Sequence, residues 1–334
     1  MPDGEPRGPA VDETWYDVVV VGGGAAGLSG ALALGRARRR VLLVDAGQPR
    51  NAPASHVHTF LTRDGVPPAE FLAVGREEVR RYGTELVEGR VTAAERAGRG
   101  FAVTLSDGRT VHARRVLLAT GLVDELPDVP GLAQRWGRDV LHCPYCHGWE
   151  SRDRRLGVLA TSRLAVTAAE TWRQWSGDVV LLQHRAEAPS GGDAERLAAL
   201  GVRVVEGAVT GVELDGDRLA GVRLVTGEVV ALDAVVVTPR HVARADVAAS
   251  LGLEIVDVTA GTEVLGRQIA AYPTGATAVP GVWVAGNAGD VRGQLVSMAA
   301  AGAEAGAAIN ADLTGEDTRE AVTALRASLA TQPA

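Results

Sequence analysis

The fold is decided by the stretch Tyr16-Asp17-Val18-Val19-Val20-Val21-Gly22-Gly23-Gly24-Ala25-Ala26-Gly27, near the start of a chain of 334 residues. The β-branched apolar residues up to Val21 predict a buried strand, and the small residues from Ala25 to about Gly35 predict a helix. A second apolar strand, Val41 to Val44, follows. This order predicts a βαβ unit with a parallel sheet.

The glycine loop between the first strand and the helix has the spacing of a dinucleotide-binding turn. Gly22 permits a tight turn, Gly24 lets a pyrophosphate approach the backbone, and Gly27 allows the helix to pack closely on the strand. The helix N-terminus, with Ala26 in its first turn, supplies N–H donors and a favourable dipole. Asp45 ends the second strand, where a carboxylate can bind both hydroxyls of an adenosine ribose. The motif alone fits either FAD or NAD.

The rest of the chain contains a second α/β pattern, and then a last strand and helix that should belong to the first domain. Alternating segments at 85–91, 101–105 and 110–118 predict a small antiparallel layer beside the main sheet. A second α/β pattern follows, with strands at 156–160, 179–183 and 234–237, a helix at 164–175, and alternating segments at 202–214 and 219–225. The strand at 281–285 and the helix from Leu295 to Asn310, followed by a polar tail, should complete the first domain.

The composition of the chain argues against several classes of function. The chain is 46% hydrophobic, enough for two domains of about 150 residues each. The net charge is −7 and the scattered basic residues are all arginine, which makes nucleic acid an unlikely partner. No apolar run reaches the ~18 residues of a membrane helix, and residues 1–14 are polar, without the apolar core of a signal peptide. We expect a soluble cytoplasmic protein with no membrane partner.

The two cysteines lie together in Cys143-Pro144-Tyr145-Cys146-His147. This spacing closes a small disulfide ring, so it indicates a redox pair whose thiol pKa a nearby cation or helix N-terminus could lower. Zinc would need two more ligands, and the histidines at 142 and 147 are too close in sequence for the usual paired spacing, so we expect no metal. Two buried, inert cysteines are the other alternative. His147 is placed to accept or return a thiol proton near neutral pH, or it is structural.

The order of these motifs resembles the low-molecular-weight thioredoxin reductase family over nearly all of residues 15–312. The shared motifs are the glycine loop, Ala119-Thr120-Gly121, the C-x-x-C pair and Pro280 to Asn287. The resemblance implies FAD in the first loop and a homodimer. It also implies an α/β fold of two Rossmann-like domains, each a three-layer ββα arrangement, with the second inserted in the first. We place the FAD-binding domain at 1–121 and 245–334, and the inserted, dithiol-carrying domain at 122–244.

The resemblance also implies roles for individual residues. Cys146 would face the flavin and Cys143 would attack the substrate, while His147 stands where the family has an acid/base aspartate. Asn287 replaces the aspartate that binds the ribityl chain, and an amide can still bond a hydroxyl. Gln294-Leu295 would begin a helix at the flavin pyrimidine edge, where a helix N-terminus stabilises negative charge. The expected flavin contacts are completed by Asn51, Val91, Thr120 and Gly121.

The inserted domain departs from NADPH-using relatives at both nucleotide motifs. Its loop reads Ala160-Thr161-Ser162-Arg163-Leu164-Ala165, without glycine, so Cβ atoms occupy the surface that a pyrophosphate should approach. The basic stretch is reduced to His184-Arg185, followed by Ala186-Glu187-Ala188. We expect the NADPH site to be lost, although Arg163 could compensate.

Without a pyridine nucleotide, electrons would run from a substrate dithiol through the cysteines to FAD and then to oxygen. The string Cys143 to Glu150 resembles the flavin dithiol oxidases that close disulfides in holomycin, gliotoxin and romidepsin, the holomycin type most of all. This implies a small-molecule dithiol substrate and hydrogen peroxide as by-product. A thioredoxin reductase using NADPH or ferredoxin, and a flavin redox sensor without turnover, are the alternatives.

Other side chains have weaker signals. The aromatic residues Tyr145, Trp149 and Trp136 could line a substrate pocket or simply pack. His56, His58 and His142 could assist His147 or face solvent.

Overall fold

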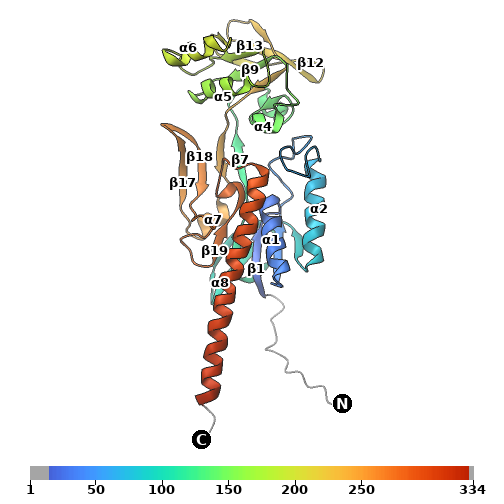
Figure 1. Cartoon of the computed structure of the whole chain (residues 1–334), viewed down its shortest axis with the longest axis vertical. Coiled ribbons are helices and arrows are strands. Elements are labelled where there is room, and N and C mark those ends of the chain that lie inside the picture. Colours follow the sequence, from blue (N-terminus) through green and yellow to red (C-terminus); the bar gives the residue numbers. More distant parts are fainter. Residues whose placement is uncertain (1–14, 331–334) are drawn as a thin grey trace.

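A computed structural model describes residues 15–330 of the chain. Residues 1–14, for which the sequence predicts a polar segment, and residues 331–334 lie outside the described part. The described chain forms two parts stacked along its long axis, one around β1 (Trp15–Val21) and the other around β9 (Leu156–Leu159) (Figure 1).

The first part is built on a seven-stranded sheet. In order, its strands are β3 (Glu85–Glu88), β2 (Val41–Asp45), β1, β6 (Thr110–Leu118), β5 (Gly100–Leu105) and β4 (Val91–Ala97), with β19 (Val282–Val284) also paired to β6. Along β1, Val18 and Val20 face one hydrophobic core and Val19 and Val21 face another. A strand buried on both faces reads as a continuous apolar run, as the sequence predicts.

Helices cover one face of this sheet and shorter elements cover the other. The first face carries α1 (Ala25–Arg36), α2 (Pro68–Arg81) and α8 (Leu295–Ala330), and the opposite core includes α7 (Asp246–Ser250). The last strand and helix lie with the first part, because β19 pairs parallel to β6 and α8 packs in the same hydrophobic core.

Two predictions for this part are wrong. The segment at 85–91 does not join an antiparallel layer, because β3 pairs parallel to β2 at the sheet edge. The hairpin of β4 and β5 is also no separate layer, since β5 pairs with the start of β6 in the main sheet.

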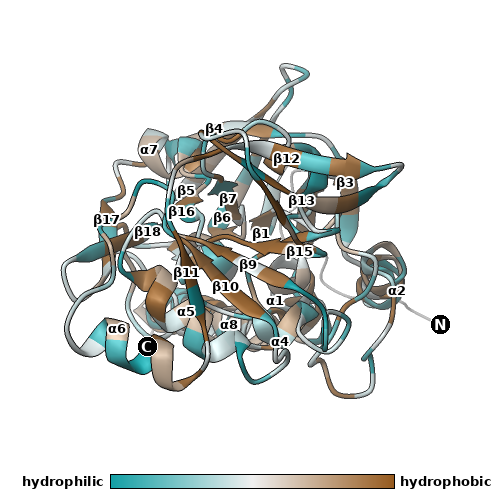
Figure 2. Ribbon diagram, turned by 90° about the horizontal axis from the view of Figure 1, so that it is seen from above, coloured by the Kyte–Doolittle hydropathy of each residue, from teal (hydrophilic) through white to brown (hydrophobic). Residues whose placement is uncertain are grey.

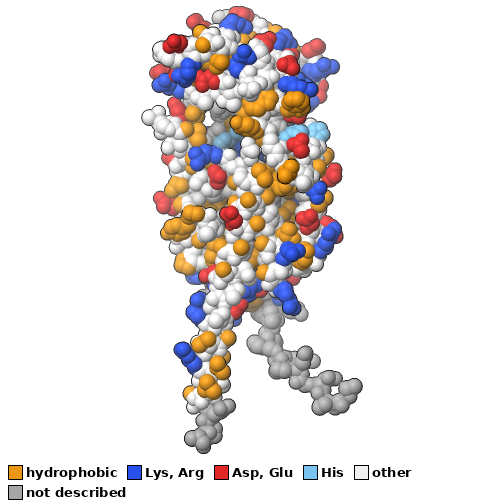
Figure 3. Space-filling model, viewed as in Figure 1, with side chains coloured by type: hydrophobic (Ala, Val, Ile, Leu, Met, Phe, Trp, Pro, Cys, Tyr) orange, Lys and Arg blue, Asp and Glu red, His pale blue; other side chains and the backbone are white. Residues whose placement is uncertain are grey.

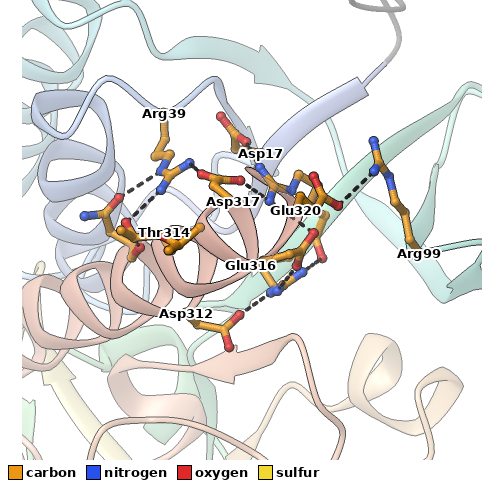
Figure 4. A network of polar contacts seen from close by, with 12 residues as sticks. Asp17, Arg39, Arg99, Asp312, Thr314, Glu316, Asp317 and Glu320 are labelled. Carbon is orange, nitrogen blue, oxygen red and sulfur yellow. Dashed lines mark hydrogen bonds and ion pairs between the residues drawn. The ribbon is translucent and has the colours of Figure 1, made fainter. Parts of the chain in front are cut away.

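Helix α8 continues beyond the predicted end at Asn310, to Ala330. Its middle packs in the core through Ile309 and Leu313, and beside them an ion-pair network holds the helix (Figure 4). Arg115 Nε lies 2.6 Å from Asp312 Oδ2 and its guanidinium also binds Glu316, while Arg39 Nη1 lies 2.7 Å from Asp317 Oδ2. These contacts anchor the polar stretch that the sequence predicts to be a tail.

The second part repeats the plan with a five-stranded parallel sheet. Its order is β11 (Arg203–Val205), β10 (Val179–Leu182), β9, β15 (Ala234–Val236) and β8 (Val140–Leu141). One face packs on α5 (Leu164–Trp172) and α6 (Gly192–Ala199), and the other on the antiparallel sheet of β12 (Val209–Asp215), β13 (Arg218–Leu224) and β14 (Val229–Ala231). Figure 2 shows the apolar strands β9 and β10 between these layers. Helix α5 ends at Trp172, three residues before the predicted end. The layers confirm the predicted α/β class with two Rossmann-like units.

A four-stranded sheet joins the two parts. Its order is β17 (Ile255–Ala260), β18 (Glu263–Ile269), β16 (Arg240–Ala243) and β7 (Leu122–Glu125). Strands β7 and β16 carry the chain out to the second part and back, and they pair antiparallel. At their base, the Arg244 N–H donates to the Gly121 carbonyl at 2.9 Å. The short helices α3 (Leu132–Arg135), α4 (Pro144–His147) and η1 (Gly286–Ala288) complete the chain. Within residues 15–330, no helix has the length and apolar character to span a membrane.

Candidate active site

A cavity of about 670 Å³ lies between the two parts and gathers nearly all of the predicted site residues. From the first part it is lined by Gly22, Gly24, Ala26, Asp45, Asn51, Val91, Thr120, Gly121, Asn287, Gln294 and Leu295, and from the second by Cys143, Cys146 and His147. Histidine side chains gather at the level of this junction, on a face where acidic and basic side chains are interspersed (Figure 3).

The glycine loop has the geometry that a phosphate-binding turn needs. Gly22 has φ +108°, and a Cβ there would lie 2.3 Å from the Ala119 carbonyl oxygen. Gly24 precedes the first residue of α1, and a Cβ at Gly24 would meet no described atom within 4 Å, so its surface faces open cavity. Gly27 lies outside the cavity, where a Cβ would fall 1.8 Å from the Gly22 carbonyl oxygen. Its role is close packing, as predicted.

Two further features of the cavity lining suit a dinucleotide. Asp45 lies at the end of β2, and one of its oxygens is 3.3 Å from Arg76 Nη2. The N-terminus of α8 also lines the cavity: the helix begins at Leu295, and the Met298 N–H donates to the Gln294 carbonyl. The open glycine loop, the carboxylate and this helix N-terminus therefore fit an FAD molecule.

Asn287 is held by its own turn. Its Nδ2 donates to the carbonyls of Asp290 and Gly293 at 2.9 and 3.0 Å, so its Oδ1 is left to face the cavity. That oxygen accepts a hydrogen bond from Arg50 Nη1 at 3.4 Å.

The dithiol lies at the start of the one-turn helix α4. The sulfur atoms of Cys143 and Cys146 are 2.7 Å apart and both thiols are half-buried and free. A hydrogen bond from Cys146, with backbone N–H donors of Cys146 and Tyr145, lowers the pKa of Cys143 to about 7. The same hydrogen bond and burial raise the pKa of Cys146. The pair therefore carries its negative charge on Cys143.

The pKa of His147 differs from the one that the sequence predicts, which is near neutral pH. Burial lowers its pKa below the ordinary histidine value, against the opposing charge of Glu150. The imidazole is therefore neutral at pH 7, which suits a base better than an acid. Burial also lowers the pKa of His142, to about 3.

Of the remaining histidine and aromatic candidates, some line the cavity and others lie on the outer surface. His56, His58, His142 and Trp136 line the cavity, and His58 Nε2 lies 3.5 Å from Glu150 across the junction. Tyr145 and Trp149 are 59% and 67% exposed on the outer surface, where Tyr145 packs edge-on against Trp175. These two aromatic rings do not line the pocket that the sequence suggests.

Three cavity residues escaped the sequence reasoning. Arg50, Asp124 and His241 form a compact cluster in which Arg50 Nη2 and His241 Nδ1 lie 2.7 and 2.8 Å from the same Asp124 oxygen. Burial raises the pKa of Asp124, but hydrogen bonds from His241 and Arg50 outweigh it and hold the pKa below its ordinary range. A charged residue within the apolar stretch Leu122-Val123-Asp124 was the available signal.

The degenerate nucleotide loop of the second part faces a hollow of only about 60 Å³. Arg163, the residue that could compensate for the lost glycines, lies with Nη2 2.7 Å from Asp193 Oδ2. Its charge is therefore already paired. Across residues 15–330, no cluster of three or more histidine, cysteine or acidic side chains could hold a metal ion.

Known proteins resemble this chain in sequence and in structure. Residues 16–305 match the family described as pyridine nucleotide-disulphide oxidoreductase. The chain is 33% identical over 319 residues to thioredoxin reductase sirT of Leptosphaeria maculans, covering 90% of this chain and 95% of that protein. A probable thioredoxin reductase of Arthroderma benhamiae is 39% identical over 189 residues, but the match covers 54% of this chain and only 46% of that protein. The crystal structure of HlmI superposes with a TM-score of 0.88 at 46% identity, covering 95% of this chain and 98% of that one.

Proposed function

Because the chain belongs to the pyridine nucleotide-disulphide oxidoreductase family, we propose that it is an FAD-dependent dithiol oxidase that closes a disulfide in a small molecule. The observation that carries the proposal is the contrast between the two nucleotide positions. The first opens into a large cavity shared with Cys143 and Cys146, whereas the second is a small hollow with its arginine paired to Asp193. Electrons can thus reach the flavin from a dithiol more readily than from NADPH.

The substrate in this proposal is a reduced dithiolopyrrolone of the holomycin type. Its two thiols lose two protons and two electrons, and oxygen takes them up as hydrogen peroxide. The likeness to HlmI and the short Cys-Pro-Tyr-Cys-His string support this class of substrate. Trp136 supplies a flat apolar surface in the cavity for a small planar ring.

Flavin binding falls to the residues that line the first half of the cavity. Gly22 to Ala26 and the N-terminus of α1 hold the pyrophosphate, Asp45 holds the ribose, and Asn287 with the N-terminus of α8 holds the flavin end. Asn51, Val91, Thr120 and Gly121 complete the contacts. Bound FAD supplies a two-electron acceptor for the reduced cysteines and a donor to oxygen.

The dithiol chemistry starts from the oxidised Cys143–Cys146 disulfide. A substrate thiolate attacks the Cys143 sulfur, Cys146 leaves as a thiolate, and a mixed disulfide forms. The second substrate thiolate then attacks the substrate's own sulfur, which closes the product disulfide and releases Cys143. The neutral ring of His147 takes the proton from an incoming thiol, because burial keeps the imidazole in its basic form.

The same proposal includes a homodimer in the cytoplasm, with the dithiol and oxygen as its small-molecule partners. The family resemblance supports the dimer, and the use of two cysteines as a reactive pair fits a reducing compartment.

Oxygen uptake with a reduced dithiolopyrrolone tests the function. We expect one hydrogen peroxide for each disulfide formed by the FAD-loaded protein. Cys143→Ser and Cys146→Ser should each reduce the rate to background. Uptake that persists in both variants, or dithiol oxidation without multiple turnovers, would contradict the proposal.

A further inference from the structure

We propose that Arg50 is a positioning residue whose fixed positive charge favours the thiolate form of the Cys143–Cys146 pair. The inference rests on the proposed function, because thiol–disulfide exchange proceeds through a thiolate. It assigns a role to a residue outside every motif of the sequence.

Arg50 is held rigidly at one place in the cavity. Its Nε and Nη2 bind the two oxygens of Asp124 at 2.8 and 2.7 Å, which is a bidentate pair. His241 Nδ1 lies 2.8 Å from the same carboxylate, and the Asp124 side chain is only 5% exposed. Three elements therefore fix the guanidinium: the loop after β2, strand β7 and strand β16.

Arg50 lies on the dithiol side of the cavity, because its Nη2 is 3.4 Å from His241 Nδ1 and the His241 ring centroid is 5.1 Å from that of His142, the residue before Cys143. Arg50 lines the same cavity as the two cysteines. The hydrogen bond from Cys146 is the largest cause that lowers the pKa of Cys143, and the charge of Arg50 adds to it. For Cys146, the same charge opposes the rise that Cys143 and burial produce. A charge in a partly buried site acts more strongly than one in water.

The amide of Asn287 neutralises the positive charge of Arg50 less than a carboxylate at this position would. Its Oδ1 lies 3.4 Å from Arg50 Nη1, and an amide oxygen accepts the hydrogen bond without adding a negative charge. Asp124 is then the carboxylate that pairs with Arg50, and His241 shares it.

The other ionisable groups around the dithiol do not supply this charge. His142 and His147, on the dithiol's own segment, are kept neutral by burial. Asp124 and His241 come from the linking strands, and His56 and His58 from the loop after Arg50. Arg90, Arg244 and Arg292 also line the cavity, but Arg50 is the arginine whose charge acts on both thiols. A guanidinium stays charged at every pH of interest.

The test measures thiol reactivity in the full-length, FAD-loaded protein after reduction and removal of the reductant under nitrogen. Iodoacetamide alkylation is followed by mass spectrometry from pH 5 to 10, peptide by peptide. For Arg50→Gln we expect the apparent pKa of Cys143 alkylation to rise by about one unit, and the rate at pH 7 to fall about five-fold. Arg50→Lys should recover most of the wild-type profile, because it keeps the charge.

Arg244→Gln is the matched control, since Arg244 lines the same cavity and donates to the Gln48 carbonyl in the loop that carries Arg50. Its alkylation profile should match the wild type. Asn287→Asp gives a second arm that keeps Arg50: the new carboxylate should shift the profile in the same direction as Arg50→Gln. An unchanged profile in Arg50→Gln, or in Asn287→Asp where Arg50→Gln fails to fold, would overturn the inference. An alkylation profile of Arg50→Lys that matches the profile of Arg50→Gln would also overturn the inference. Oxygen uptake plays no part in this measurement, so failure of the oxidase proposal would be seen separately.

Discussion

Arg163 and Asp193 form an ion pair, with Nη2 2.7 Å from Oδ2, at the edge of the small hollow beside the degenerate loop of the second part. Asp193 also binds Arg196, with Nη2 3.1 Å from Oδ1. The arginine that could have replaced the lost phosphate-binding glycines is thus engaged within the protein.

We therefore predict that NADPH is a poor electron donor. In anaerobic stopped-flow absorbance, NADPH should bleach the flavin at least about 100-fold more slowly than a reduced small dithiol, because the phosphates lack their hydrogen bonds. Asp193→Asn frees Arg163 and separates the two causes: because the loop still lacks its glycines, this variant should regain only a small part of the NADPH rate. Rapid bleaching of the wild type by NADPH would favour a reductase.

Gly24 and Gly27 should respond differently to alanine. A Cβ at Gly24 enters cavity that is open among the described residues, so Gly24→Ala should keep the unfolding free energy within about 1 kcal/mol but lower flavin occupancy. A Cβ at Gly27 would overlap the Gly22 carbonyl, so Gly27→Ala should destabilise the fold by about 3 kcal/mol or more. The flavin-to-protein absorbance ratio and urea unfolding measure the two effects. Equal loss of stability in both variants would count against this assignment.

Buried histidines should make the protein sensitive to acid. His142 titrates near pH 6.5 in the unfolded chain but at about 3 in the folded protein, so the unfolded chain binds more protons between these values. Stability is therefore full above pH 6.5 and is lost as the pH falls toward 3, by about 1.4 kcal/mol per unit for one such histidine. His147 acts in the same direction.

Urea unfolding of the FAD-loaded protein at pH 7.5, 6 and 5 measures this loss. His142→Asn should flatten the dependence, because the asparagine does not titrate. The same slope in the wild type and the variant would show that His142 is not responsible.

The ion pairs of α8 should stabilise the protein more where their side chains are more buried. The Arg115 side chain is 9% exposed and binds Asp312 and Glu316, so Arg115→Gln leaves a half-buried carboxylate short of a partner and should cost about 2 kcal/mol. Arg99→Gln is the control, since its pair with Glu320 is 72% and 55% exposed and should contribute less than about 1 kcal/mol. Thermal unfolding at low and high salt would compare them. An equal effect of both changes would contradict the role of burial.

The parts of the fold that depend on local pattern could be predicted from the sequence. The strands at 16–21, 41–44 and 156–160 are continuous apolar runs because both faces of their sheets are buried. The glycine loop and the C-x-x-C pair were likewise readable, because their chemistry requires fixed spacing. Residues 22–26 of the loop and both cysteines line the cavity.

Features that depend on distant partners could not be predicted in this way. The sequence pattern ends helix α8 too early because, within the described chain, the helix buries no side chain after Leu313 and is held there by arginines from β6 and from the turn before β2. Arg50, Asp124 and His241 are separated by 74 and 117 positions along the chain, so no local pattern joins them. The edge pairing of β3 also needed the partner strand to be known.

The hydrogen bond between the Arg244 N–H and the Gly121 carbonyl has a mechanical consequence. The chain leaves the first part and returns to it at one spot, so within residues 15–330 the second part is tethered through a single antiparallel pair of strands, β7 and β16. A tether at one spot acts as a pivot, so the position of the dithiol over the cavity depends on the contacts that close the junction, among them the pair of His58 with Glu150.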